Sequence, residues 1–342
     1  MFIPKRIIFE KGALDYPIGK EIYQSFIRNK DIEMIGLQGN RIKETIPGDS
    51  LAEFYKEGKN TLVVGVKKGA KFQTCRPSAH YQLPLVSGCI GHCQYCYLNT
   101  NLGDKPYTKI NVNVEELLDQ AGEYIRERLP EPTLFEGSAT SDPVPVEPYS
   151  RLLKTAIEYF ANTPDGRFRF VTKYTDIDTL LDIWHNNHTE IRFTLNTEKV
   201  IGEYENRTPS MEKRIDASIK VIQAGYPTGF LIAPVFLYEN WKGDYRSLLT
   251  LLEAKLPEKL SHPITFEIIS HRYTTRARNV ISELFPENSL PMKDEERSYK
   301  YGQFGYGKYV YPREQLEEVS EFFEQELAKI FINREIQLKY II

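Results

Sequence analysis

The stretch HYQLPLVSGCIGHCQYCYLNT, residues 80–100, places three cysteines directly after a short run of strand-forming residues. Cys89, Cys93 and Cys96 follow the spacing C-x3-C-x2-C, and Gly88 and Gly91 allow the backbone to pass close to a bound group. Three cysteines within eight residues on a glycine-flanked loop are unusual for core packing. The stretch therefore predicts a strand whose carboxyl end carries a metal or iron–sulfur site.

Strand-like and helical segments alternate after this stretch. We expect strands at residues 80–87, 133–138, 167–173, 190–196, 228–236 and 264–270. We expect helices at residues 114–129, 149–162, 177–187, 209–224, 245–256 and 274–284. Six βα units in series predict an α/β fold with a parallel sheet and right-handed crossovers. The pattern alone leaves a partial (β/α) barrel and an open sheet as alternatives, and the cysteines would lie at the mouth of a barrel.

Two segments lie outside this alternation. Residues 1–79 contain a strand-like run at 60–69 and predict an N-terminal cap, and residues 80–296 form the predicted barrel. Residues 297–313 contain five Tyr, one Phe, three Gly, two Lys and two Arg but no acidic residue. Glycines between alternating aromatics indicate a β-hairpin, so residues 297–342 are predicted as a hairpin followed by a C-terminal helix.

Composition limits the classes of function. The 342 residues include 44 Lys and Arg and 47 Asp and Glu, which gives a net charge of -3. This balance excludes a strongly basic nucleic-acid coat protein. The first residues lack the apolar core of a signal peptide, and the longest apolar run, residues 229–238, is too short to cross a bilayer. We expect a cytoplasmic protein without membrane contact.

The three clustered cysteines allow more than one kind of site. A 4Fe-4S cluster normally has four thiolate ligands, so three cysteines would leave one iron open to substrate or cofactor. A zinc site is the alternative, with His92, His80 or Cys75 as the fourth ligand, although no second cysteine pair is present. Cys75 stands apart from the cluster and carries no signal of its own, since a lone cysteine is more often a small core residue.

Several motifs resemble those of the radical S-adenosylmethionine (SAM) superfamily, and within it the spore photoproduct lyase family. The C-x3-C-x2-C spacing with an aromatic residue before the third cysteine carries the first resemblance. The second rests on residues 75–107, FEGSATSDPV (135–144), FEIISHRYT (266–274) and KYGQFGYGKYVY (300–311). This resemblance implies a partial (β/α)6 TIM-like barrel and a lyase that reverses an ultraviolet-induced thymine lesion in DNA. It also implies a 4Fe-4S cluster that cleaves SAM to a 5'-deoxyadenosyl radical.

The resemblance also assigns roles to individual residues. It implies that Cys89, Cys93 and Cys96 ligate the cluster and that Tyr95 and Tyr97 lie beside SAM and the lesion. The positions that it assigns to SAM binding are Ser141, Lys173, Thr194 and Ala233. Taken alone, Ser141 could instead cap a helix and Lys173 could be a solvated charge. The implied partners are ultraviolet-damaged DNA and an electron donor such as a flavodoxin or ferredoxin, and the protein is expected to be a monomer.

One position departs from the family pattern. The family's hydrogen donor is a cysteine immediately before the TSD triplet, and this chain has Ala139 there. Alanine cannot donate a hydrogen of that kind, so we expect a naturally diverged branch in which Tyr95 or Tyr97 supplies the hydrogen, or in which the lesion differs. A radical SAM relative with another substrate and a non-catalytic, metal-containing DNA-binding protein are the alternatives.

The aromatic hairpin predicts a nucleic-acid interface. An enzyme that acts on a stacked base must extrude it, and an aromatic side chain can fill the vacated space. We expect nucleic-acid contacts from Lys300, Tyr301, Phe304, Tyr306 and Lys308, with the lysines on phosphates. Gln303 stands where the family pattern has a basic residue. For Tyr309 and Tyr311, a half-buried strand face is an equally good interpretation.

Overall fold

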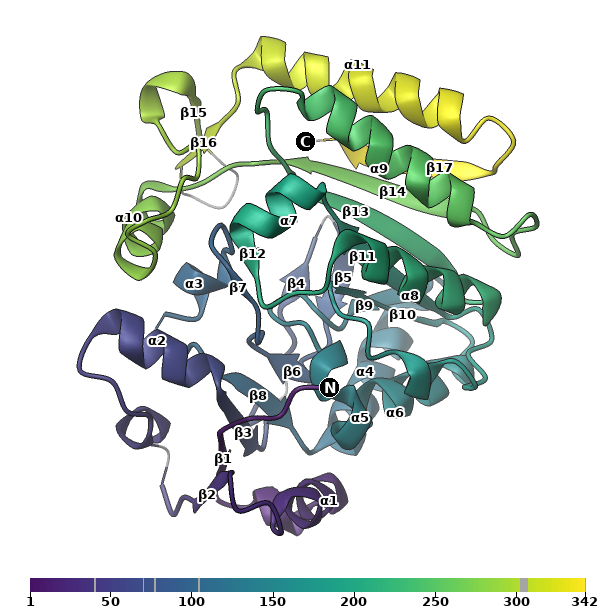
Figure 1. Cartoon of the computed structure of the whole chain (residues 1–342). Helices are drawn as coiled ribbons and strands as arrows, with labels where there is room; N and C mark the ends of the chain where they lie inside the picture. The colour runs from purple at the N-terminus through teal and green to yellow at the C-terminus, as the bar shows by residue number, and fades with distance from the viewer. Residues whose placement is uncertain (40, 70, 77, 104, 302–306, 342) are drawn as a thin grey trace. The chain divides into compact units, whose positions relative to one another are not determined.

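The computed structural model describes residues 1–39, 41–69, 71–76, 78–103, 105–301 and 307–341 (Figure 1). The chain forms two compact units, one comprising Met1–Gly91 and Asn101–Ile191 and the other comprising His92–Thr100 and Arg192–Ile342. Strand β11 (Thr189–Leu195) has residues in both units. The domain boundaries expected after residues 79 and 296 stay a prediction.

The first unit contains a sheet that the sequence revealed only in part. Its strand order is β2-β1-β3-β8-β6. The strands are β1 (Arg6–Phe9), β2 (Glu33–Gly36), β3 (Thr61–Gly65), β6 (Val86–Ser87) and β8 (Thr108–Asn111). All pairs are parallel except β6 with β8. Strand β3 is the one expected at 60–69, and helices α1 (Pro17–Phe26) and α2 (Leu51–Lys59) belong to the same region.

The first unit also holds one half of the βα series. Its strands are β4 (Thr74–Cys75), β5 (Ala79–Gln82), β9 (Thr133–Glu136), β10 (Gly166–Thr172) and the start of β11, in the order β11-β10-β9-β5-β4. Strands β5, β9 and β10 are parallel, and β4 is antiparallel to β5. The helices are α4 (Val114–Arg128), α5 (Glu147–Ser150) and α6 (Leu152–Ala161), of which α4 contacts β9 and α6 contacts β10.

The second unit continues the series with the order β17-β14-β13-β11. Strands β13 (Thr228–Val235), β14 (Ile264–Ser270) and β17 (Ile336–Ile341) are parallel. Helices α8 (Met211–Gln223), α9 (Trp241–Lys255) and α11 (Arg313–Ile330) lie along one face of these strands (Figure 1). Smaller elements complete this part: β7 (His92–Cys93), α3 (Leu98–Asn101), α7 (Glu198–Tyr204), β12 (Glu205–Asn206), α10 (Thr275–Leu284), β15 (Ser298–Tyr301) and β16 (Gly307–Val310).

The expected α/β alternation is present, with two errors and one omission. The strand expected at 80–87 is wrong, because it is two strands in different sheets, β5 and β6, separated at Pro84, which has no N–H to donate. Strand β17, which pairs with β14 after the C-terminal helix, was not expected. Strand β14 has the bounds expected from its run of β-branched and aromatic residues, and it is buried along most of its length, as parallel strands are.

The helix expected at 177–187 is wrong, because the helical structure in this segment is one 3-10 turn at Asp178–Leu180. Asn186 and Asn187 adopt positive φ angles of 48° and 57°, which a right-handed helix cannot contain. Among the described helices, none combines the length and apolarity needed to cross a bilayer.

Candidate active site

The cysteine loop begins at Gly88, a position that only glycine fits. Its φ is +82°, and a Cβ placed there would lie 2.2 Å from the carbonyl oxygen of Tyr107. The Gly88 N–H donates to the Thr140 carbonyl at 2.9 Å, and the Asp142 N–H donates to the Gly88 carbonyl at 3.3 Å. Main-chain bonds in the first unit therefore tie the residue before Cys89 to the TSD loop that follows β9.

Cys89 lies in a polar, electropositive setting. The ammonium of Lys59, a side chain in α2 that is 3% exposed, donates to the Cys89 carbonyl at 2.7 Å and lies 5.2 Å from the centre of the Tyr55 ring. The Gly91 N–H donates to the Cys89 sulfur at 3.3 Å. Hydrogen bonds to sulfur and nearby positive charge stabilise thiolate and set the potential of an iron–sulfur cluster. The donor set around Cys89 thus fits such a group.

The TSD loop is fixed by Asp142, which the sequence analysis did not single out. Its carboxylate accepts hydrogen bonds from the Thr172 hydroxyl at 2.8 Å and from the N–H groups of Lys173 at 2.8 Å and Val144 at 3.4 Å. Burial raises the pKa of Asp142 to about 6, against the lowering effect of these bonds. Asp142 joins the end of β10 to the loop, so Ser141 and Lys173, both expected to bind SAM, are brought together within the first unit.

The backbone on either side of Ala139 is held against β10. The Gly137 N–H donates to the Arg169 carbonyl at 2.8 Å, and the Ser138 hydroxyl accepts from the Val171 N–H at 2.7 Å. The same hydroxyl donates to Glu136 at 2.7 Å. Ala139 itself is partly exposed. A side chain at position 139 therefore projects from a well-fixed segment at the carboxyl end of β9.

The remaining two cysteines belong to the second unit, where a short antiparallel ribbon holds them. Strand β7 pairs with β12 so that Cys93 lies opposite Glu205. The Gln94 N–H donates to the Tyr204 carbonyl at 2.9 Å, and the Cys96 N–H donates to the Cys93 carbonyl at 3.2 Å. Cys93 is buried, whereas Cys96 is partly exposed.

One strand of this ribbon carries the acidic partner of a buried ion pair. The Arg214 guanidinium donates to Glu205 at 2.6 Å, and both side chains are fully buried. Arg214 also donates to the Thr194 carbonyl at 3.2 Å, while the Tyr95 hydroxyl donates to the other oxygen of Glu205. Burial, and then the charge of Glu205, raise the pKa of Tyr95 well above its ordinary value. One network therefore connects the cysteine loop to Thr194, a residue expected to bind SAM.

The other expected site residues of the second unit lie at strand ends or at the surface. Thr194 is buried near the end of β11, and Ala233 is partly buried near the end of β13. Tyr97 is 51% exposed. Carboxyl ends of parallel strands are where ligands bind in such folds. In the described part of the chain, no three His, Cys, Asp or Glu side chains converge closely enough for a single metal ion.

Comparisons with known proteins identify the family. The family model "Spore photoproduct lyase" matches residues 2–341. A spore photoproduct lyase of Clostridium acetobutylicum is 55% identical, over 99% of this chain and 98% of that protein, and one of Bacillus subtilis is 43% identical, over 98% of each.

The chain belongs to the spore photoproduct lyase family. Solved structures agree: a double mutant of such a lyase, with bound AdoMet and dinucleoside spore photoproduct, superimposes with a TM-score of 0.95 at 41% identity, over 100% of this chain and 99% of that one. A spore photoproduct lyase complexed with the dinucleoside lesion gives the same TM-score. The predicted family, the α/β fold that its solved members share and the class of lyase are confirmed.

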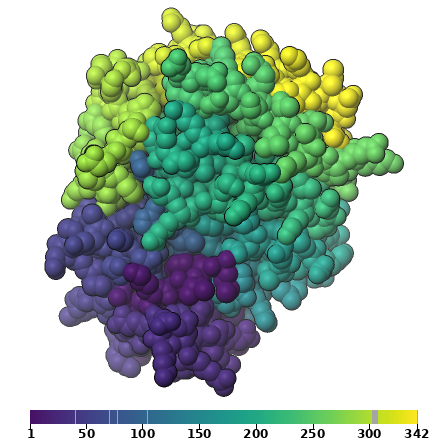
Figure 2. Space-filling view, in the orientation of Figure 1, coloured from purple at the N-terminus to yellow at the C-terminus, as the bar shows by residue number. Residues whose placement is uncertain are grey.

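The hairpin of this spore photoproduct lyase family member has two different faces. Tyr301 is 71% exposed, and Lys300 lies opposite Lys308 in the β15–β16 pairing. Phe304 and Tyr306, also expected to contact nucleic acid, lie outside the described residues. Figure 2 shows the yellow-green hairpin region at the surface.

The two tyrosines with an alternative interpretation pack inward. The Tyr309 ring stacks on Tyr273 with 5.2 Å between centres. Tyr311 is buried, accepts a hydrogen bond from the Leu237 N–H at 3.1 Å and lies under the Arg297 guanidinium at 3.6 Å. The structure therefore favours the half-buried strand face for both.

Sequence reasoning missed four residues that hold the site: Lys59, Asp142, Glu205 and Arg214. Asp142 had the strongest signal, because it completes the TSD triplet within a quoted motif. The other three lie in ordinary charged segments, and a buried charge cannot be recognised in sequence without its partner. Only the folded chain shows that they contact the cysteine loop or its neighbours.

Proposed function

We propose that this chain repairs spore photoproduct in ultraviolet-damaged DNA. In this proposal Cys89, Cys93 and Cys96 hold a 4Fe-4S cluster. The residues proposed to contact SAM are Ser141, Lys173, Thr194 and Ala233. Membership of the spore photoproduct lyase family is the observation that carries the proposal. A small electron-transfer protein such as a flavodoxin or ferredoxin, a monomeric state and a cytoplasmic location complete it.

The cluster and SAM would supply the one-electron chemistry that abstracts a hydrogen atom from the lesion. The residues of the chain place and protect these groups. Lys59 and Gly91 direct hydrogen-bond donors at Cys89, and Asp142 orders the segment that carries Ser141. Arg214 binds Glu205, which accepts from Tyr95 of the cysteine loop, and it also donates to the Thr194 carbonyl. These bonds hold the cysteine loop and the end of β11 in place before cluster and SAM bind.

We further propose that Cys75 returns the hydrogen atom in place of the residue missing at Ala139. Support comes from the double mutant with bound AdoMet and lesion, in which one cysteine is replaced by alanine and one serine by cysteine. Its two substituted positions are 64 residues apart, as Cys75 and Ala139 are here. This chain thus has naturally the two residue types that were engineered into that relative.

The position of Cys75 is compatible with this role. It is partly exposed, it lies in β4, and β4 pairs with β5, which pairs in turn with β9, the strand that leads to Ala139. In the transfer, the S–H bond of Cys75 breaks homolytically, a C–H bond forms at the thymine methyl carbon, and the unpaired electron remains on sulfur. A thiol is a ready hydrogen-atom donor and requires no prior ionisation.

The tyrosines are the second candidates. The Tyr95 hydroxyl already donates its hydrogen to Glu205, so transfer would break a bond to a buried carboxylate. Tyr97 is better placed because it is exposed. The relative's two substituted positions in the double mutant are each numbered one higher than Cys75 and Ala139 here. With the same difference of one, a solved tyrosine-to-phenylalanine mutant of a spore photoproduct lyase carries its change at the position of Tyr97.

Anaerobic turnover of dinucleoside spore photoproduct with SAM and dithionite tests the proposal, with products identified by mass spectrometry. The wild-type chain should yield thymidine, whereas Cys75→Ser should accumulate sulfite adducts from dithionite. Adding Ala139→Cys to Cys75→Ser should restore part of the thymidine yield. Clean repair by Cys75→Ser, together with adducts from Tyr97→Phe, would assign the hydrogen to Tyr97 instead. No repair by the iron-loaded wild type would assign the chain a different substrate.

Iron and sulfide analysis separates the two roles of cysteine. Cys89→Ala, Cys93→Ala and Cys96→Ala should each lose the cluster, because two irons would then lack a protein ligand. Cys75→Ala should retain about four iron and four sulfide per chain. Loss of iron from Cys75→Ala would show that Cys75 is a ligand and would contradict its role as hydrogen donor. One zinc and no chromophore in the wild type would favour a non-catalytic DNA-binding protein.

A further inference from the structure

One face of the sheet in the first unit carries a buried pair of opposite charges. Phe135 of β9 and Phe168 of β10 pack on the Phe160 ring of α6, with 5.4 and 5.3 Å between ring centres. Alternate residues of a strand face opposite sides, so Glu136 and Arg169, the next residues along these strands, lie on the face away from α6. They are direct register partners, both are buried, and the Arg169 Nε donates to Glu136 Oε2 at 3.1 Å.

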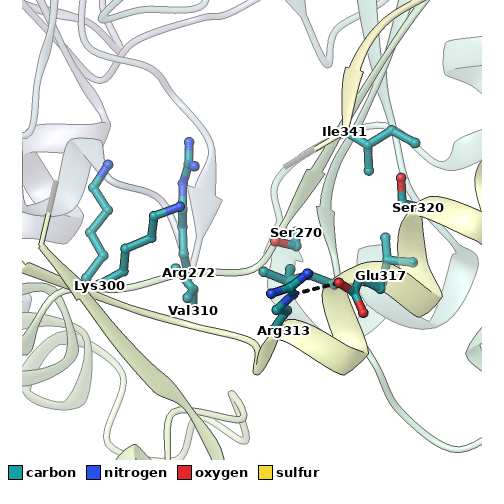
Figure 3. A pocket seen from close by; sticks show the side chains of 11 residues that line it. Ser270, Arg272, Lys300, Val310, Arg313, Glu317, Ser320 and Ile341 are labelled. Atoms are coloured by element: carbon teal, nitrogen blue, oxygen red, sulfur yellow. Dashed lines mark hydrogen bonds and ion pairs between the residues drawn. The ribbon is translucent and has the colours of Figure 1, made fainter. Parts of the chain in front are cut away.

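Burial distinguishes this pair from an ion pair at the surface. Figure 3 shows such a surface pair, Arg313 with Glu317 in α11, whose exposed side chains are 2.7 Å apart. Water screens the charges of a surface pair, so the pair contributes little to stability. A buried arginine must satisfy its donors within the protein, and its planar fork fixes the direction of each hydrogen bond. The partners of Arg169 therefore show what it holds in place.

The other partner of Arg169 is Ser78, 91 residues earlier in the sequence. The Arg169 Nη2 donates to both the carbonyl and the hydroxyl of Ser78. Ser78 directly precedes β5, and β9 lies between β5 and β10 in the sheet. Arg169 thus reaches past the neighbouring strand to the ribbon on which Cys75 pairs with Ala79. We call β4, Ser78 and β5 the Cys75 ribbon.

The Cys75 ribbon lies at the edge of its sheet. Strand β4 has two residues and is last in the order β10-β9-β5-β4. Its register with β5 is irregular between Thr74 and Cys75. A short edge strand is held by few ladder bonds and opens more easily than an interior strand. A side-chain bond from β10, an interior strand, therefore limits the motion of the segment that carries Cys75.

Glu136 extends the same connection to the segment before Ala139. Its other carboxylate oxygen, Oε1, accepts from the Ser138 hydroxyl at 2.7 Å and from the Ser138 N–H at 3.3 Å. One continuous chain of hydrogen bonds therefore joins the Cys75 ribbon to Ser138, the residue before Ala139.

We propose that Arg169 is a positioning residue, which holds the Cys75 ribbon so that the Cys75 thiol lies within hydrogen-transfer distance of the thymine methyl radical of the opened lesion. The inference rests on the proposed function and on the role proposed there for Cys75. Transfer of a hydrogen atom from sulfur to carbon requires close approach, and a displacement of about 1 Å can cost about 100-fold in rate. Arg169 gives and takes no hydrogen atom itself.

The test measures the fate of the radical in anaerobic turnover of dinucleoside spore photoproduct. Hydrogen transfer and trapping by dithionite compete for the same radical, so the ratio of thymidine to adduct reports the transfer rate and leaves out enzyme that is unfolded or not loaded. Arg169→Lys keeps the charge opposite Glu136, but one ammonium cannot replace the two nitrogens that bind Glu136 and Ser78. The ratio should fall about tenfold. Ser78→Ala removes one of the two acceptors and should lower the ratio by less.

Two controls are matched to this change. Arg167→Lys alters the same strand, but Arg167 binds main-chain carbonyls within three residues of itself, so its ratio should equal that of the wild type. When Cys75→Ser is combined with Ala139→Cys, the thiol is no longer on the ribbon, and adding Arg169→Lys should leave the ratio unchanged. An equal fall in that background, or with Arg167→Lys, would show a general disturbance and overturn the positioning role.

Hydrogen exchange provides a readout that does not depend on repair. Amides of residues 74–82 should exchange faster in Arg169→Lys than in the wild type or in Arg167→Lys, because the ribbon has lost its bond to β10. Unchanged exchange in this segment would overturn the inference.

Failure of the inference is distinguishable from failure of the proposed function. No repair by the wild type would overturn the proposed function, and clean repair by Cys75→Ser would overturn the donor role of Cys75; the inference falls with either. If Cys75→Ser accumulates adducts but Arg169→Lys and Ser78→Ala both keep the wild-type ratio, the role of Arg169 alone is overturned.

Discussion

Replacing Arg214 with Met should separate the cysteine loop from the strand that carries Thr194. The change keeps much of the side-chain volume but removes the 2.6 Å bond to Glu205 and the 3.2 Å bond to the Thr194 carbonyl. Glu205 would then be a buried carboxylate that has lost the Arg214 guanidinium and keeps the hydrogen bond from Tyr95. We expect loss of stability and also loss of cluster retention.

The size of the stability effect follows from burial. Breaking a fully buried ion pair by removing one partner costs about 3–5 kcal/mol, because the other charge is left uncompensated. Tyr95→Phe removes only one hydrogen bond to a charged acceptor and should cost about 1.5–3 kcal/mol. Combining Arg214→Met with Glu205→Gln should recover part of the loss, since no unpaired charge then remains.

A second buried pair in the same unit provides the control. Arg192 and Glu267 are 2.9 Å apart, and their side chains are 2% and 3% exposed. Arg192→Met should therefore lower the denaturation midpoint about as much as Arg214→Met does. The assay compares iron content after anaerobic reconstitution, at a temperature where circular dichroism shows both variants folded. Arg214→Met should lose iron and Arg192→Met should keep it.

The comparison can refute the reasoning in two ways. Equal iron content in Arg214→Met and Arg192→Met would show that the Glu205 network stabilises the unit without positioning the cysteine loop. A loss of less than about 1 kcal/mol in the free energy of unfolding of Arg214→Met would show that the Glu205 charge does not destabilise the fold when Arg214 is removed.

Three further changes concern the first unit. The pKa of Asp142 in the folded protein is about 6, above its ordinary value of 3.8. The free energy of unfolding should therefore fall by at most about 3 kcal/mol as pH rises from 3.8 to 6, because the unfolded chain loses this proton first. Denaturant titrations at several pH values should show this fall in the wild type and not in Asp142→Asn. Gly88→Ala should cost about 2 kcal/mol or more, from the left-handed backbone and the clash with Tyr107, and an unchanged melting temperature would contradict it. Lys59→Met removes a positive charge beside Cys89 and should make the cluster potential more negative in a redox titration, whereas a positive shift would contradict the electrostatic argument.

The parts of the fold and site that sequence predicted are those encoded locally. Strand β14 follows from its own composition, and Cys89, Cys93 and Cys96 identify themselves by spacing. The residues that the sequence did not reveal act over long separations. Tyr95 and Glu205 are 110 residues apart, and Lys59 and Cys89 are 30 apart. No periodicity connects such partners, because a buried charge becomes tolerable only when the fold supplies its counterpart.

Local conformation explains the error in the predicted helices. The segment 177–187 has enough apolar residues for a helical stripe, yet Asn186 and Asn187 adopt left-handed φ angles and the helix does not form. Asparagine tolerates that region better than most residues, so its presence favours a turn. A helix prediction that weighs only apolar spacing misses this competing preference.

The two faces of the hairpin make its strands sensitive to length. Because side chains alternate with a period of two, inserting one residue within β15 would turn the residues beyond it over, so that lysine and tyrosine would exchange faces of the ribbon. Two inserted residues would restore the alternation and only lengthen the ribbon. Natural relatives should therefore differ in these strands by even numbers of residues, and odd changes should fall between the strands.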